Sequence, residues 1–173
     1  DGYIDPFLFL QNLSLITDNS DILALCSSGG SFTGALQTYL IKESQIATTS
    51  PAHASMGYGL PTAIGASIAN PNCNVILTEG EGGFSQSLQE LAVIKNRKLP
   101  VKIFIMDNNG YASTRSTQKK FFGGTYLGCD PKTGLAFPNW KELFKAYDIP
   151  CQHLKKADIQ PRRLKSILSR SSG

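Results

Sequence analysis

The chain has 173 residues, of which 41% are hydrophobic and 17% are charged, and its formal net charge is +4. This composition excludes an intrinsically disordered chain, which would carry fewer apolar residues and more charge. The length is sufficient for one domain with a sizeable core, and no apolar run reaches the length of a membrane span. We therefore expect a single globular domain over residues 1–173 that has no membrane partner.

Short runs that are apolar throughout alternate with amphipathic or alanine-rich runs, which is typical of a parallel sheet covered by helices on both faces. In chain order, the expected elements are a helix at 5–16, a strand at 22–26, a turn at 27–31, a helix to about 42, a strand at 45–49, a helix at 56–70, a strand at 74–78, a helix at 84–96, a strand at 101–106, an irregular segment at 108–138, a helix at 139–147, a strand at 149–154 and a helix at 160–169. Asp5 and Pro6 suit the N-cap and first position of the first helix. The pattern predicts a three-layer α/β/α fold.

The expected irregular segment, 108–138, contains glycines and few periodic apolar residues. Long irregular segments inside compact domains are usually functional. We expect a mobile lid anchored by Phe121 and Phe122. The alternative is a fixed surface loop held by those two side chains and Tyr126.

Two turns follow neighbouring expected strands. The first, 80–84, carries Glu81, and the second, 107–111, carries Asn108, which lies 27 positions further along the chain. The carboxyl ends of parallel strands meet at one edge of a sheet, so the two turns should lie close together. A carboxylate, an amide oxygen and a backbone carbonyl suit Mg²⁺ that holds a diphosphate.

This pair of turns resembles the signature of thiamine-diphosphate enzymes, in which Gly-Asp-Gly is followed at a similar distance by Asn-Asn. The flanking residues 55–66, 87–92 and 99–102 also look like the C-terminal, diphosphate-binding domain of the acetolactate synthase and pyruvate decarboxylase group. The similarity runs from about Asp5 to about Ile149. It implies the thiamine-diphosphate-binding fold. The family's domain continues with one more strand after its last helix, so we expect a sheet that is short of this strand or a chain end that was altered.

The resemblance implies a Mg²⁺ site made by Glu81, the Asn108 side chain and the main-chain carbonyl of Gly110. The residues implied to contact thiamine diphosphate come from four segments. They are Gly29, Gly30 and Ser31; Ala54, Ser55 and Met56; Gly80, Glu81, Gly82, Gly83 and Phe84; and Asn108, Gly110, Tyr111 and Ala112.

Some of these positions have specific implied roles. Met56 aligns with the bulky residue on which the cofactor bends, and Ala54 would offer its carbonyl to the aminopyrimidine. Gly82 and Gly83 precede an expected helix, whose free amides attract phosphate. Ser27 to Ser31 would contact the diphosphate from the end of the first strand.

Each of these features also has an ordinary explanation. Glu81 could be a solvated acid near a helix N-terminus, and Asn109-Gly110 is a common tight-turn dipeptide. Glu81 also departs from the family's aspartate by one methylene, while Mg²⁺ demands short, near-octahedral ligation. His53 could move protons near the cofactor, although loop histidines commonly have no such role.

The resemblance further implies a 2-keto acid substrate and an incomplete active site. The family's activating glutamate lies on a separate pyrimidine-binding domain of the same or a second subunit, so we expect no catalytic residue in this chain and a homodimer or tetramer of the full-length protein. Thr117 stands where acetolactate synthases have a tryptophan, which makes that activity less expected.

Two alternatives remain, a separately encoded small subunit of a two-chain decarboxylase and a degenerate, non-catalytic domain of the same fold. Because Asp1 is not a start methionine, we expect a fragment of a longer chain. The four cysteines, Cys26, Cys73, Cys129 and Cys151, are scattered, so we expect no zinc site and a reducing cytoplasm. The basic residues near the C-terminus suit a solvated helix face, and we expect no nucleic-acid partner.

Overall fold

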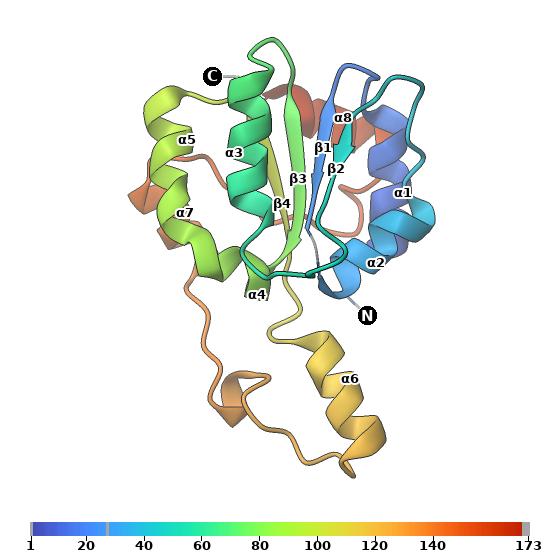
Figure 1. Cartoon of the computed structure of the whole chain (residues 1–173), viewed down its shortest axis with the longest axis vertical. Helices are drawn as coiled ribbons and strands as arrows, with labels where there is room; N and C mark the ends of the chain where they lie inside the picture. The colour runs from blue at the N-terminus through green and yellow to red at the C-terminus, as the bar shows by residue number, and fades with distance from the viewer. Residues whose placement is uncertain (1, 27, 171–173) are drawn as a thin grey trace.

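The computed structural model describes residues 2–26 and 28–170, in which helices and strands alternate (Figure 1). The helices are α1 (Pro6–Ile16), α2 (Gly29–Thr38), α3 (Gly59–Ala69), α4 (Glu81–Phe84), α5 (Leu91–Arg97), α6 (Ala112–Phe121), α7 (Trp140–Ala146) and α8 (Pro161–Arg170), with 3₁₀ turns η1 (Ser85–Glu90) and η2 (Pro131–Thr133). The strands are β1 (Ile22–Leu25), β2 (Ala47–Thr48), β3 (Val75–Gly80) and β4 (Val101–Met106). None of the helices in these residues is both long and apolar enough to cross a membrane.

The four strands form one parallel sheet in the order β2-β1-β3-β4, which confirms the predicted α/β class. The register pairs Val75 with Val101 at the start of β3 and β4, and Gly80 with Met106 at their ends. The two strands therefore finish level with each other. The turns that follow them leave the sheet at the same edge, as the sequence predicted.

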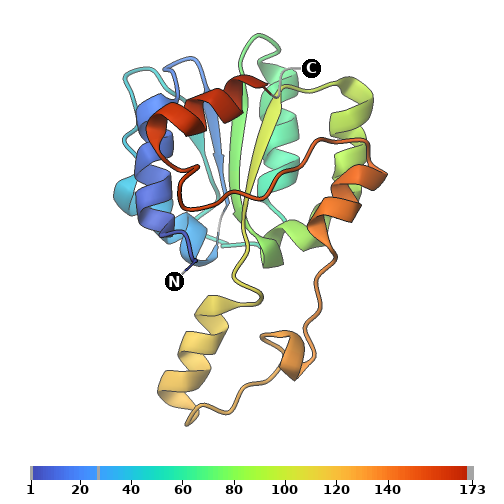
Figure 2. The ribbon, with the colours of Figure 1, turned by 180° about the vertical axis from the view of Figure 1, so that it is seen from behind.

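Two hydrophobic clusters lie on opposite faces of the sheet, which confirms the three layers (Figure 2). Successive side chains of a strand point to opposite faces of the sheet. In β1, Ile22 and Ala24 therefore belong to one cluster, while Leu23 and Leu25 belong to the other. Helices α3, α5 and α7 cover the first face, and α1, α2 and α8 cover the second.

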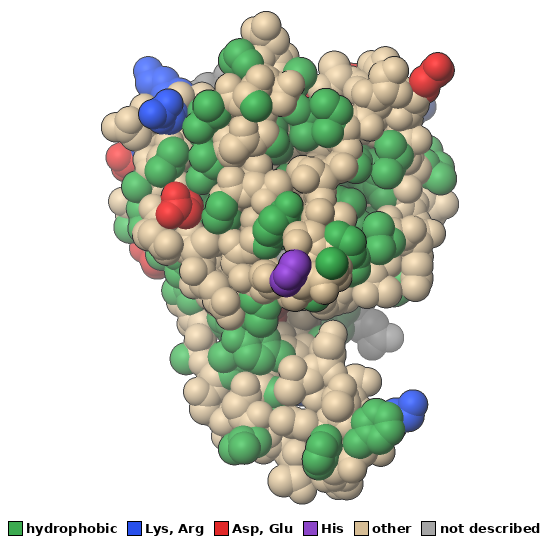
Figure 3. All heavy atoms as spheres, viewed as in Figure 1, with side chains coloured by type: hydrophobic (Ala, Val, Ile, Leu, Met, Phe, Trp, Pro, Cys, Tyr) green, Lys and Arg blue, Asp and Glu red, His purple; other side chains and the backbone are tan. Residues whose placement is uncertain are grey.

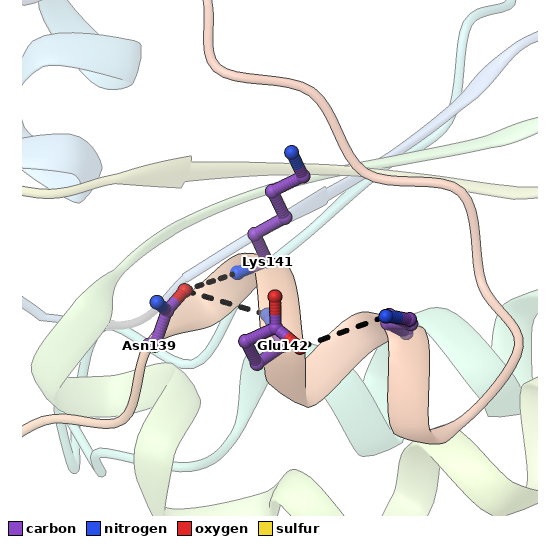
Figure 4. A network of polar contacts seen from close by, with 4 residues as sticks. Asn139, Lys141 and Glu142 are labelled. Carbon is purple, nitrogen blue, oxygen red and sulfur yellow. Dashed lines mark hydrogen bonds and ion pairs between the residues drawn. The ribbon is translucent and has the colours of Figure 1, made fainter.

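Side-chain caps fix the starts of two helices at the predicted positions. Asp5 Oδ1 accepts hydrogen bonds from the N–H groups of Phe7 at 2.8 Å and Leu8 at 3.3 Å. Asn139 caps α7 in the same way (Figure 4), accepting from the N–H groups of Lys141 at 3.1 Å and Glu142 at 3.4 Å. These caps satisfy donors that the helix itself leaves free.

The strand predicted at 149–154 is wrong, because the described residues form no strand there. Pro150 has no N–H to give to a strand ladder. The segment instead crosses the sheet at β4 on its way to α8 (Figure 2), and Leu154 and Ile159 pack into the second hydrophobic cluster. Within 149–154, Ile149 and Leu154 are half-buried against opposite faces of the sheet, while Pro150 and Cys151 are exposed.

Two helix boundaries also differ from the prediction. The helix expected from Met56 begins at Gly59, since the positive φ of Gly57 (79°) interrupts a helical path. The helix expected at 84–96 begins earlier, as α4, and is broken by η1, in which Ser87 has non-helical angles. The strand expected at 45–49 shortens to β2.

The segment 108–138 is not irregular as predicted, because it contains α6 and η2. Figure 1 shows this segment as an arm that projects from the carboxyl edge of the sheet. Helix α6 has no buried residue, and hydrophobic side chains lie on the arm's surface (Figure 3), with Phe121, Phe122 and Leu127 at least 64% exposed. No core contact therefore supports α6.

The two ends of the arm are fixed to the domain by aromatic contacts. The rings of Tyr111 and Phe137 lie edge-on at 6.3 Å, and Phe137 contacts Trp140 at 6.2 Å between ring centroids. Trp140 also contacts the buried ring of Phe84 at 5.9 Å and donates its indole N–H to Asp107 Oδ2 at 3.1 Å. The chain thus leaves the sheet and returns to it at one place.

Glu79 is an acid buried within the fold, with only 2% of its surface exposed. Burial raises the pKa of this carboxyl to about 7, and the N–H groups of Gly59 and Leu60 at the start of α3 only partly offset that effect. Its Oε2 atom has no partner in hydrogen-bond geometry within the described part of the chain. The charged form of Glu79 should therefore destabilise the folded state.

We predict that Glu79→Gln removes a pH dependence of stability. The folded-state pKa of about 7 exceeds the unfolded value of 4.5, so the folded state binds more protons between these values. Wild-type stability should then fall by about 3 kcal/mol as pH rises from below 4.5 to above 7. Chemical denaturation across this range should show the loss in wild type and in the exposed control Glu43→Gln, but not in Glu79→Gln. Parallel profiles for all three proteins would contradict the prediction.

Candidate functional site

The carboxylate of Glu81 joins the two turns at the carboxyl edge of the sheet. The residue is 1% exposed, and its Oε1 atom accepts hydrogen bonds from the N–H groups of Asn108 at 3.0 Å and Gly110 at 2.8 Å. Its Oε2 atom lies 3.5 Å from the amide nitrogen of the Asn108 side chain. The structure therefore brings together all three residues that the sequence assigned to a metal.

The conformation of the second turn depends on its local sequence. Asp107 Oδ1 accepts the N–H of Asn109 at 2.9 Å, and Asn109 has a positive φ of 59°, which asparagine tolerates better than most residues. Gly110 has a φ of 149°, and a Cβ at this position would overlap Arg115 and the carbonyl of Cys129. Only glycine fits there, and its N–H is thereby directed at Glu81.

The charge of Glu81 is incompletely compensated. Burial raises the pKa of this carboxyl, and nearby Asp107 raises it further, while the N–H groups of Gly110 and Asn108 lower it. A buried carboxylate of this kind is stabilised by a bound cation, because the cation supplies the missing positive charge.

The donor atoms at this edge match the hard oxygen ligands of Mg²⁺: a carboxylate, a carboxamide and a main-chain carbonyl. The described residues contain no cluster of three or more His, Cys, Asp or Glu side chains that could hold a metal, so this set has a single acid. The side-chain amide of Asn108 is not oriented for metal binding, because its NH₂ group, and not its oxygen, points at Glu81. The residues fit Mg²⁺ in chemistry once this amide is reversed.

Tyr111 and Met56 lie against the glycine turn. A Cβ on Gly82 would overlap the ring of Tyr111 and lie 3.3 Å from the terminal methyl of Met56. Gln86 Nε2 lies 3.6 Å from the sulfur of Met56. Two predicted cofactor residues from distant segments therefore flank the predicted phosphate turn.

The glycines of the first turn are placed differently from the prediction. Gly82 and Gly83 lie inside α4 and not before it, since this short helix begins at Glu81. Their N–H groups remain among the first-turn donors that no helical carbonyl accepts. The Phe84 side chain is fully buried between Trp140 and Phe144, so only its main chain remains for a cofactor contact.

The other predicted cofactor residues surround this edge with fewer contacts. The Ser31 hydroxyl is buried and lies 2.8 Å from Cys26 Sγ, while Gly29 and Gly30 are exposed at the start of α2. Ser27 lies outside the described residues. Ala54, which has a left-handed φ of 48°, is exposed.

The remaining predicted residues are also at the surface. Ser55 and His53 are exposed in the loop before α3, and Ala112 is exposed at the start of α6. The structure thus brings only part of the predicted cofactor set next to Glu81.

Sequence reasoning missed Arg115, whose guanidinium lies on the second turn and donates to Asn108 Oδ1 at 2.7 Å. The segment around it has no apolar period, so nothing predicted the helix that places this side chain. It also missed the bond between Trp140 and Asp107, which joins residues 33 positions apart.

Comparisons with known proteins agree with this arrangement. The family model described as thiamine pyrophosphate enzyme, C-terminal TPP binding domain, matches residues 28–171. Acetolactate synthase 1, chloroplastic, of Zea mays is 30% identical over 95% of this chain and 26% of its own length. Acetolactate synthase isozyme 2 large subunit of Escherichia coli (strain K12) is 35% identical over 70% of this chain and 22% of its own length.

A solved structure shares the fold. The thiamine diphosphate-dependent 4-hydroxybenzoylformate decarboxylase of Rhodococcus jostii RHA1 superposes with a TM-score of 0.82 at 22% identity, over 98% of this chain and 31% of that one. The chain therefore spans between 22% and 31% of the length of these three proteins.

The family model covers most of the chain, and it includes both turns that Glu81 joins. This chain belongs to the thiamine pyrophosphate enzyme family, as its C-terminal TPP binding domain.

Proposed function

We propose that this chain binds Mg²⁺-thiamine diphosphate as the C-terminal domain of a 2-keto-acid decarboxylase or carboligase. The observation that supports the proposal is the contact of Glu81 with the backbone N–H groups of Asn108 and Gly110, because the residues of all three proposed ligands then lie next to one another. When bound, the cofactor would supply an electron sink for decarboxylation.

The chain's own residues would hold the cofactor and shield it from water. Glu81, the Asn108 side-chain oxygen and the Gly110 carbonyl would hold the metal. The first-turn N–H groups of Gly82 and Gly83 would donate to the diphosphate, because such groups attract anions. Tyr111 and the neighbouring Met56 would exclude water from this side.

The remaining parts of the active site would come from outside this chain. By analogy with the family, we propose a pyrimidine-binding domain, on the same or a second subunit, and a homodimer or tetramer of the whole protein. We also propose a reducing, cytoplasmic setting, since all four cysteines are free. The substrate class, a 2-keto acid, rests on the family likeness.

A second candidate function is a non-catalytic domain of the same fold. It is favoured by the length of Glu81, because its Oε1 atom reaches two N–H groups of the second turn directly and so joins the two turns without an ion. In this alternative the carboxylate closes the edge of the sheet as a structural bond.

Glu81 variants should separate the two candidates. We expect Glu81→Asp to tighten Mg²⁺-thiamine diphosphate binding, since the shorter acid leaves room for the ion between the turns. We expect Glu81→Ala to weaken Mg²⁺-thiamine diphosphate binding more strongly. Mutating a residue that only supports a metal ligand weakens metal binding by roughly 10- to 100-fold, and losing a ligand should cost more. Isothermal titration calorimetry measures both. Equal or weaker binding by Glu81→Asp contradicts this account of Glu81, and an absence of binding in wild type supports the structural alternative.

The isolated chain should show no decarboxylase turnover, because the activating glutamate belongs to the pyrimidine-binding domain. The measurement is CO₂ release from pyruvate with Mg²⁺ and thiamine diphosphate, with cofactor omitted as the control. Cofactor-dependent CO₂ release from this chain alone would show that the active site is not divided in this way.

The arm should be mobile in the isolated chain and ordered by cofactor together with the partner domain. A 10-residue helix with no buried residue is marginal on its own, so its amides should exchange quickly. Hydrogen exchange across residues 113–132 should be fast without ligand and slow in the complete complex. Strong protection in the ligand-free chain would show instead that the arm is a fixed surface element.

A further inference from the structure

The guanidinium of Arg115 binds four oxygen atoms around the second turn. Its Nη2 atom donates to Asn108 Oδ1 at 2.7 Å and to the Asn108 carbonyl at 3.1 Å. Its Nη1 atom donates to the carbonyls of Asn109 at 3.1 Å and Cys129 at 3.3 Å. Arginine presents several donors in one rigid plane, which suits such a cluster of acceptors.

This contact determines which way the Asn108 amide faces. Its oxygen is held by Arg115, so its NH₂ group faces Glu81 Oε2. A metal shared by Glu81 and Asn108 needs the opposite orientation. Reversing the amide would place its NH₂ group against the N–H groups of Arg115, where two donors would face each other. The arginine contact and metal ligation by Asn108 are therefore mutually exclusive.

The same side chain links the turn to the arm. Arg115 lies in the first turn of α6, and its own N–H donates to the Tyr111 carbonyl at 2.9 Å. The N–H of Tyr111 in turn donates to the carbonyl of Cys129, which the guanidinium also binds. The guanidinium thus connects the second turn both with the start of α6 and with the segment near Cys129 through which the arm returns.

We propose that Arg115 is a positioning residue that holds Asn108 turned away from Glu81 until a divalent cation displaces it. This inference rests on the metal site of the proposed function. The ion takes Asn108 Oδ1, the Arg115 bond to that atom breaks, and the first turn of α6 is released. Metal binding is thereby coupled to the position of the arm.

Electrostatic repulsion makes it unfavourable for Arg115 and Mg²⁺ to bind the Asn108 amide oxygen at the same time. Arg115 carries a fixed positive charge and a bound Mg²⁺ carries two, so both cannot share one amide oxygen without strong repulsion. The carboxylate of Glu81 remains in place in both states, since its Oε1 atom bonds only main-chain N–H groups of the turn.

The test compares Mg²⁺ binding in wild type, Arg115→Ala and the matched control Lys119→Ala. Lys119 lies one turn further along the same exposed helix, so the control removes the same charge. Mg²⁺ is titrated by calorimetry into each chain in the presence of saturating thiamine diphosphate. We expect Arg115→Ala to bind Mg²⁺ roughly tenfold more tightly, because a hydrogen bond involving a charged group contributes about that factor or more. Lys119→Ala should match wild type.

Hydrogen exchange gives a readout independent of activity. Amides 112–116 should exchange faster in Arg115→Ala without metal, and faster in wild type when Mg²⁺ and thiamine diphosphate are added in the absence of the partner domain, which is what slows exchange in the complete complex. Circular dichroism checks that the fold is kept, which is expected because α6 buries no residue.

The outcomes separate this inference from the proposed function. Wild-type binding with equal or weaker binding by Arg115→Ala overturns the inference and leaves the proposed function standing, as does equal tightening by Lys119→Ala. Metal binding by Arg115→Ala alone supports the inference in its strongest form. An absence of Mg²⁺ binding in both wild type and Arg115→Ala overturns the proposed metal site and the inference together.

Discussion

The hydrogen bonds of one buried carboxylate organise the functional edge of this domain. Glu81 follows β3, the turn that it binds follows β4, and the parallel register ends both strands at the same level. Because the carboxylate accepts the N–H of Gly110, it fixes the direction in which the chain leaves the sheet. The ring of Tyr111 then comes to lie over Gly82, and the guanidinium of Arg115 reaches the outer side of the turn. An apolar residue at position 81 would remove the acceptor that all of these contacts depend on.

The sequence predicts those features whose cause is local or follows from parallel topology. Continuous apolar runs indicate β1, β3 and β4 because these strands are covered on both faces. Asp5 indicates a helix start because its side chain accepts first-turn N–H groups. The meeting of Glu81 with Asn108 is also predictable, since consecutive parallel strands end at one edge of the sheet. The remaining cofactor residues are untested predictions that rest on the family likeness.

The features that could not be predicted are those in which long-range contacts replace local signals. Helix α6 has no apolar period because it buries no residue, so its sequence gives no pattern to detect. The run 149–154 does have strand-like apolar residues, but Ile149 and Leu154 pack half-buried against opposite faces of the sheet, a long-range arrangement that the pattern does not reveal. The orientation of the Asn108 amide depends on Arg115, whose position follows only from α6 and from the carbonyl of Cys129.

The aromatic contacts at the base of the arm have a consequence for how this domain tolerates change. Tyr111 and Phe137 meet at one point, so the residues between them form a closed loop whose ends are already joined. The entropy of closing such a loop varies only with the logarithm of its length, so each doubling costs about 0.6 kcal/mol. Insertions or deletions between Arg115 and Cys129 would therefore leave the packing of the sheet and the contacts of the second turn unchanged. The tip of the arm, beyond Arg115 and before Cys129, is a natural site for grafting foreign sequence onto this scaffold.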